Sequence, residues 1–165
     1  NRFPWLLVGL FGIMATAIFI SSLEKTLEKY LILAFFLPTI VYMSDAIGTQ
    51  LQTLLVRDIA IMGKNLKVGR YFSRQIAVST VISFISAVIV FAAVSLFWAQ
   101  PFIGFVIAVS MIVSFTFSAF TALAVVYMLY KMGSDPAIGS GPLATVISDV
   151  MTILIYFAVA AAMLG

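Results

Sequence analysis

Five long apolar stretches, separated by short polar connections, make up almost the whole of this chain. Each stretch is close to the roughly 20 residues that an α-helix needs to cross a bilayer, and none keeps the alternation of a β-strand. The expected spans cover about 4–20, 31–62, 75–98, 102–130 and 143–164. The pattern predicts an all-α integral membrane protein with five transmembrane helices in one domain, residues 1–165.

The second span is unusually long and unusually polar. Its roughly 32 residues would extend about 48 Å, against about 30 Å of hydrocarbon, so we expect a kink, with Pro38 as its cause. Four of its residues have helical spacing and are predicted to line one polar face: Asp45, Gly48, Thr49 and Gln52. Such a face indicates either a helix contact or a water-lined path.

The connections carry most of the charge. Residues 24–29 bring acids and lysines together and suit a short interfacial helix, 63–74 is expected to be a basic loop, and 135–142 has turn-like Asp-Pro and glycine. With five spans, one side receives Arg2, Lys64, Lys67, Arg70, Arg74 and Lys131. The positive-inside rule then predicts a cytoplasmic N-terminus and an outer C-terminus in a multi-pass cell-membrane protein.

Composition excludes several classes of function. Hydrophobic residues make up 64% of the chain and charged residues 9%, so the net charge of +3 indicates membrane topology rather than nucleic-acid binding. Histidine and cysteine are both absent, which leaves hard oxygen ligands as the candidates for a metal. No catalytic motif is found, and we expect no enzyme. The chain starts at Asn1 without a methionine, which suggests a fragment or a processed chain.

Asp149, inside the last apolar stretch, is the residue that most constrains function. A carboxylate within a span costs about 2.5–3.5 kcal/mol on insertion scales, so it must face protein, water or an ion. Thr145 and Thr152 place hydroxyls on the same helix face. The alternatives are a protonated aspartic acid or an ion pair with Arg57 of the second span.

Two further acids extend the hypothesis. Asp45 lies in the second span, where polar neighbours could also satisfy it by hydrogen bonds, and Asp135 precedes the last span, where it could instead be a turn or helix-cap residue. A cation would balance this surplus of negative charge. Mg²⁺ suits sparse ligation because it keeps several waters and binds through one or two carboxylates. Two copies of Asp149 facing each other across a dimer axis would form a carboxylate ring.

Three places in the sequence carry short motifs of particular interest. The most specific is Asp135-Pro136-Ala137, followed by Gly141-Pro142-Leu143 and Ser148-Asp149-Val150. The second is Pro38 followed by Gly48-Thr49-Gln50 and Val56-Arg57-Asp58. The third is Arg2-Phe3-Pro4-Trp5, with Glu24 in the connection that follows. In order and spacing these motifs resemble the transmembrane domain of MgtE-type magnesium transporters and their archaeal and eukaryotic relatives.

The resemblance implies a homodimer of five-span subunits in the lipid bilayer, whose ion path follows the dimer interface along the second and fifth spans. It implies that Asp149 is the pore aspartate for hydrated Mg²⁺ and that Asp135 is an acid near the cytoplasmic mouth. Asp45 is a further candidate metal site. The predicted pore lining comprises Thr145, Ser148, Thr152, Gly48, Thr49, Gln52 and Gly141, with Arg57 at the cytoplasmic end.

The sequence also departs from the family pattern. The asparagine-rich element of the second span is here Ser44 to Gln50 and contains the new acid Asp45, a family glutamate is Gln75, and an asparagine near the mouth is Gly141. The family's regulatory CBS domains are absent from this chain, so a separate regulatory domain or subunit would be needed for that control.

Three alternatives to a divalent-cation channel remain. A Na⁺- or H⁺-coupled Mg²⁺ exchanger on the same fold would give Asp45 a role. An intramembrane aspartyl protease would use two acids on two spans. A membrane subunit that transports nothing would bind no ion.

Overall fold

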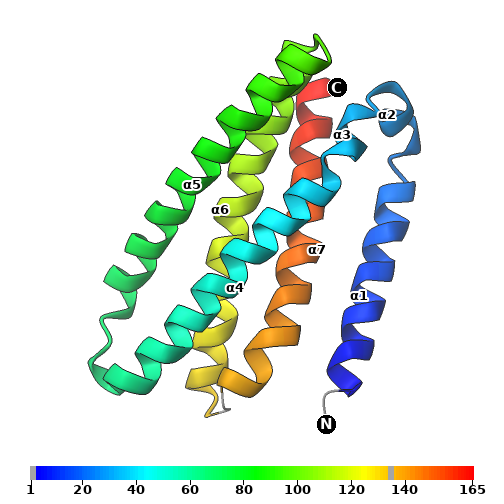
Figure 1. Cartoon of the computed structure of the whole chain (residues 1–165). Coiled ribbons are helices and arrows are strands. Elements are labelled where there is room, and N and C mark those ends of the chain that lie inside the picture. Colours follow the sequence, from blue (N-terminus) through cyan, green and yellow to red (C-terminus); the bar gives the residue numbers. More distant parts are fainter. Residues whose placement is uncertain (1–2, 134–135) are drawn as a thin grey trace.

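The structure, a computed structural model, describes the backbone of residues 3–133 and 136–165 (Figure 1). At positions 3–5, 8, 26, 64 and 136–143 it describes the backbone alone. The described chain is helical, which confirms the all-α expectation. Its elements are α1 (Phe3–Ser21), α2 (Glu24–Lys29), α3 (Ile32–Phe35), α4 (Leu37–Met62), the 3-10 helix η1 (Gly63–Asn65), α5 (Val68–Phe97), α6 (Pro101–Lys131) and α7 (Pro136–Leu164).

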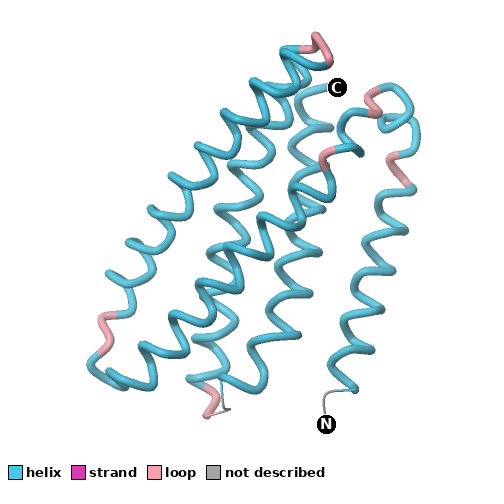
Figure 2. The backbone as a smooth tube through the Cα atoms, viewed as in Figure 1, coloured by secondary structure: helices cyan, strands magenta, loops and turns pink. Residues whose placement is uncertain are grey.

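The long helices run up and down in alternation, joined by short turns (Figure 2). Within the described residues, four helical segments are long and apolar enough to cross a membrane: Ile32–Met62, Val68–Phe97, Pro101–Lys131 and Ala144–Leu164. The described apolar part of α1, Gly9–Ser21, is shorter. Four spans are therefore supported by length and composition, and the fifth stays a prediction.

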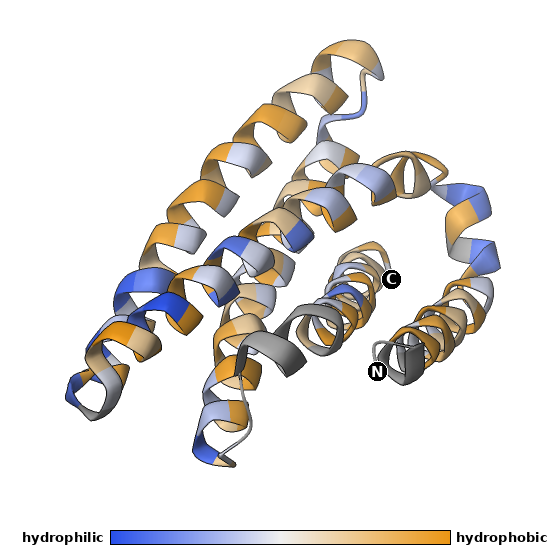
Figure 3. Ribbon diagram, turned by 60° about the horizontal axis from the view of Figure 1, so that its bottom comes forward, coloured by the Kyte–Doolittle hydropathy of each residue, from blue (hydrophilic) through white to orange (hydrophobic). Residues whose placement is uncertain are grey.

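Helix α6 is the centre of the bundle. It packs against α4, α5 and α7, whereas α1 packs against α7 at the side of the molecule. The α6 side chains Met111, Phe115 and Leu123 are completely buried. Figure 3 shows helices that are mainly hydrophobic, with hydrophilic positions at the connections and along α4. The buried polar side chains are shared among several helices and include Ser44 of α4, Ser118 of α6 and Thr152 of α7.

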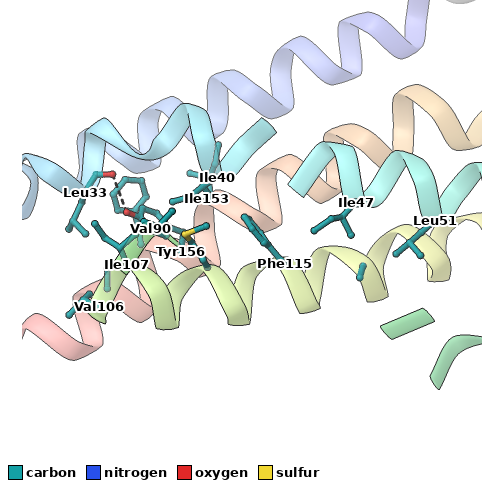
Figure 4. Close-up of a cluster of buried hydrophobic side chains, with 14 of the residues drawn as sticks. Leu33, Ile40, Ile47, Leu51, Val90, Val106, Ile107, Phe115, Ile153 and Tyr156 are labelled. Atoms are coloured by element: carbon teal, nitrogen blue, oxygen red, sulfur yellow. Dashed lines mark hydrogen bonds between the residues drawn. The ribbon is translucent and has the colours of Figure 1, made fainter. Parts of the chain in front are cut away.

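The expected interruption near Pro38 is present, between α3 and α4. Proline has no backbone N–H to donate to Ala34, and the helix breaks at Phe36, two residues earlier. Beside the break, the Tyr156 hydroxyl of α7 donates a hydrogen bond of 3.1 Å to the Leu33 carbonyl oxygen (Figure 4). Tyr156 is fully buried, and this bond joins α3, just before the break, to α7.

Two expected connections are shorter in the structure. The turn expected over 135–142 is wrong, because α7 already begins at Pro136. Proline is favoured in the first turn of a helix, and helices in membranes tolerate further glycine and proline. The loop expected over 63–74 ends early, since α5 begins at Val68 and carries Arg70 and Arg74 on its first turns. Long basic side chains allow a helix to continue past the hydrocarbon.

Gly104 permits the close approach of α5 and α6. A Cβ added there would lie 3.2 Å from the Phe91 carbonyl oxygen and 3.2 Å from Val94 Cβ, neither of which can rotate away. We expect Gly104→Leu to destabilise the folded chain by about 1–3 kcal/mol through overpacking. Reversible unfolding in mixed detergent measures this. Gly69→Leu is the control, since nothing lies within 4 Å of a Cβ there; equal stability of the two variants would contradict the close-packing account.

Candidate functional site

Asp149 lies on α7, in the part that packs against α4, and its side chain is half-buried. Its Oδ1 atom is buried and has no hydrogen-bond partner among the residues that the structure describes. A charged carboxylate oxygen that is buried without a hydrogen bond lowers the stability of the fold by several kcal/mol, because its lost hydration is not replaced. The described residues therefore leave this oxygen of Asp149 without a partner.

Asp45 lies on the neighbouring helix α4 and is also half-buried. It accepts a hydrogen bond of 3.3 Å from the Thr49 hydroxyl, one turn along the same helix. Its carboxylate is near enough to Asp149 for the two negative charges to repel each other. The structure thus brings together two of the three predicted metal-site acids, from two helices that pack side by side.

Arg57 does not neutralise this pair. Its guanidinium group forms an ion pair with the adjacent Asp58, with 2.9 Å between Nη2 and Oδ1. A second bond of 2.9 Å joins Arg57 Nε to the same oxygen. The alternative in which Arg57 pairs with Asp149 is therefore wrong for this structure. The negative charge of Asp149 has to be balanced in another way, by a proton or by a cation.

A junction of three hydroxyl groups lies next to the acids and was not foreseen as a unit. The Ser44 hydroxyl of α4 donates to the Ser118 hydroxyl of α6 at 2.8 Å and also bonds the Thr152 hydroxyl of α7 at 2.5 Å. All three side chains are fully buried. The junction holds the helices that carry Asp45 and Asp149 in fixed relative positions.

The register of each helix indicates which way the acids face. Asp45 follows Ser44, and Asp149 follows the buried Ser148, so each acid is turned by about 100° from an inward-facing neighbour. Both acids therefore lie at the edge of the protomer rather than in its core. Thr152, in contrast, faces the interior and is engaged with Ser44.

Removing the junction should loosen α4 from its neighbours. We expect Ser44→Ala to lower the free energy of unfolding by about 0.6–2 kcal/mol, because interhelical hydrogen bonds in membranes have that strength. Unfolding in mixed detergent measures it. Ser86→Ala is the control, because among the described residues its hydroxyl bonds only the Ile82 carbonyl of its own helix. If Ser44→Ala and Ser86→Ala lower the free energy of unfolding by the same small amount, the junction does not stabilise the packing of α4.

The predicted polar face of α4 is divided in the structure. Gly48 is buried near Ser118 and Ala122 of α6, and Gln52 is also buried, whereas Thr49 is exposed. The four residues therefore do not share one environment. A row of polar side chains is exposed along the same helix: Thr49, Gln50, Thr53 and Arg57. Thr49 and Arg57 were predicted site residues, whereas Gln50 and Thr53 were not.

The remaining predicted residues have mixed positions. Thr145 is half-buried on α7, one turn before Asp149, and Ser148 is buried with its hydroxyl oxygen unbonded among the described residues. Asp135 lies outside the described residues. Gly141 lies within α7, in the segment whose backbone alone is described. Their predicted roles at the mouth of a path stay predictions.

Hard oxygen ligands are the chemistry that this site offers. Within the described parts of the chain, no three His, Cys, Asp or Glu side chains gather around one point. Two carboxylates and nearby hydroxyls do not make a closed cage for a dehydrated ion. They suit a divalent cation that retains most of its water, as Mg²⁺ does.

Comparison with known proteins agrees with this chemistry. The family model described as "MgtE: Divalent cation transporter" matches residues 37–159. A magnesium transporter MgtE of Bacillus subtilis (strain 168) is 33% identical over 164 residues, which are 98% of this chain and 36% of that protein. The MgtE magnesium transporters of Enterococcus faecalis and Thermus thermophilus are 31% and 28% identical, over 97% and 96% of this chain and 36% and 35% of those proteins.

The matched region contains α4, α5, α6 and most of α7, and so includes both acids of the site. The chain spans about a third of the length of the curated relatives that it matches. The family is described by transport rather than by catalysis. By the extent of these matches, the chain belongs to the MgtE family of divalent cation transporters.

Proposed function

We propose that this chain forms the membrane pathway of a divalent-cation channel or transporter whose main substrate is Mg²⁺, with Asp149 as the ion site. The observation that carries the proposal is the buried Oδ1 atom of Asp149, which has no partner in the described residues. A passing hydrated cation would supply the missing partner. Membership of the family supports divalent cations as the class of substrate.

The proposed assembly is a homodimer with the ion path at the interface. Asp45 and Asp149 lie at the edge of the protomer, and the exposed row Thr49, Gln50, Thr53 and Arg57 follows α4. Lipid tails would leave these groups without hydrogen bonds, at a cost of several kcal/mol. A second copy, with water between the copies, would provide a polar environment. The two Asp149 carboxylates would then face one path.

We give supporting roles to the other predicted site residues. The charge of Asp45 would make the local potential more negative and attract the cation toward Asp149. Asp135 and Gly141, which come after Lys131 in the sequence, would lie at the mouth of the path. Thr145 and Thr49 would offer hydroxyls to the waters of the ion. The relatives are longer than this chain, so we propose that control of opening comes from a further domain or subunit.

The orientation follows from the charges at the two ends of the bundle. Lys67, Arg70 and Lys131 lie in or beside the connections at the end where α1 begins, and Lys25 and Lys29 lie at the other end (Figure 1). By the positive-inside rule we propose a cytoplasmic N-terminus and an outer C-terminus. Cations would then enter through the outer end and be driven by a membrane potential worth about 2.3 kcal/mol per charge at 100 mV.

A coupled exchanger is the second candidate, and Asp45 favours it. An acid beside the ion site could take up a proton or Na⁺ when Mg²⁺ leaves. Proteoliposomes filled with a Mg²⁺-sensitive dye separate the candidates. We expect Mg²⁺ influx that follows its own gradient and the membrane potential and is unchanged when Na⁺ and H⁺ gradients are removed. Influx that requires either gradient would support the exchanger, and absence of any influx would contradict both candidates.

A further inference from the structure

A basic hollow lies at the end of the bundle where α4 turns through η1 into α5. Its volume is about 580 Å³, and its lining includes the basic side chains of Arg57, Lys67, Arg70 and Arg74. Among the described residues of the lining, Asp58 is the single acid, and it is paired with Arg57. Arg70 and Arg74 are one helical turn apart and so share a face of α5. The hollow therefore has a surplus of positive charge and suits an anion.

Two backbone and side-chain features add to this preference. Helix α5 begins at the hollow without a side-chain cap, so its first N–H groups add the partial positive charge of a helix N-terminus. The Tyr71 hydroxyl is buried beside Asp58 and Gln75, without a well-formed hydrogen bond to either among the described residues. This hydroxyl is a donor that an oxygen-rich ligand could use.

The membrane side of the hollow is apolar. Val78 lies two turns deeper than Arg70 along α5 and is 50% exposed, and Met62 at the end of α4 is 49% exposed. Both side chains belong to the lining. Cations at the end of a span with exposed apolar side chains just below match the two parts of a phospholipid, a charged headgroup and acyl chains.

From these features we propose that the hollow binds the phosphate headgroup of an anionic phospholipid from the leaflet at this end of the bundle. Arg70 and Arg74 hold the phosphate oxygens, Lys67 and the start of α5 add to the attraction, and the acyl chains lie against Val78 and Met62. A soluble phosphate would use the same cations but not the apolar wall. The hollow shares Arg57 with the exposed row along α4, whereas Asp149 is not part of its lining.

Lipid binding can be tested without any measurement of ion flux. The purified chain in a neutral detergent is titrated with short-chain phosphatidylglycerol, with phosphatidylcholine of the same chain length, and with glycerol 3-phosphate as the headgroup alone. Bound lipid is counted by native mass spectrometry. We expect phosphatidylglycerol to bind in preference to the other two, and the affinity to fall by about 10- to 30-fold in Arg70→Gln/Arg74→Gln.

The matched control is Lys25→Gln/Lys29→Gln, which removes the same charge from the opposite end of the bundle and should leave binding unchanged. Arg74→Lys keeps the positive charge at this position and should retain most of the phosphatidylglycerol binding. This result would show that substitution at position 74 does not by itself unfold the chain. Equal binding of phosphatidylcholine, equal binding of glycerol 3-phosphate, or an equal loss in the control variant would each overturn the proposal.

Discussion

Replacing Asp149 with asparagine is expected to abolish Mg²⁺ uptake by proteoliposomes. Asparagine has nearly the same shape but no charge, so it cannot balance a divalent ion at a half-buried position. A hydrogen bond to a charged group contributes about 1.5–3 kcal/mol, and a symmetric dimer would lose two of them. We therefore expect the initial rate of influx to fall by at least about 100-fold.

The control for this variant is Glu28→Gln, which removes an exposed carboxylate from α2, outside the apolar helices. It should leave influx within about twofold of the unsubstituted chain, since exposed surface charges act weakly. Asp149→Asn should remain folded, because the substitution removes a buried charge and keeps the volume. Uptake at the original rate by folded Asp149→Asn would contradict the role of this residue.

Replacing Asp45 with asparagine is expected to weaken Mg²⁺ transport without removing it. The Asp45 charge acts on Asp149 from the neighbouring helix, and its loss lowers the negative potential that attracts the ion. An interaction of about 1–2 kcal/mol, typical of charges in a partly hydrated place, corresponds to a rise of about 5- to 30-fold in the Mg²⁺ concentration for half-maximal influx. Concentration series in proteoliposomes measure it.

Asp45→Glu keeps the charge and should restore most of the affinity. The same series, repeated with imposed Na⁺ and H⁺ gradients, also examines the exchanger. On the channel account, neither Asp45→Asn nor the unsubstituted chain responds to those gradients. A response that disappears in Asp45→Asn would move the assignment to coupled exchange, and an unchanged affinity in Asp45→Asn would remove Asp45 from the site.

The helices were largely predictable because a bilayer requires long apolar segments with satisfied backbones. The interruption near Pro38 was predictable for a local reason, the backbone N–H that proline lacks. The start of α7 at Pro136 was not. Asp-Pro and closely spaced glycines favour a turn when only neighbouring residues are considered. The helix that the structure has there depends on packing against other helices, which local sequence does not reveal.

The acids of the candidate site could be singled out from the sequence because a carboxylate within an apolar run is costly wherever the helix packs. Their surroundings were not. Ser44 meets Ser118 and Thr152 across separations of 74 and 108 residues, and no local spacing indicates such contacts. The division of the α4 face, with Gln52 buried and Thr49 exposed, likewise depends on where α6 lies. Mg²⁺ chemistry could be argued from residue types, whereas the dimer interface remains a proposal.

The most direct measurement is the structure of the protein in bilayer discs or crystals with Mn²⁺ in place of Mg²⁺, with the metal located by its anomalous scattering. The account predicts a peak between the Asp149 carboxylates of two copies, farther from them than the roughly 2.1 Å of a direct bond because water lies between. A saturating Mn²⁺ structure in which Asp149 faces lipid or the interior of one protomer, with no metal beside it, would contradict the account.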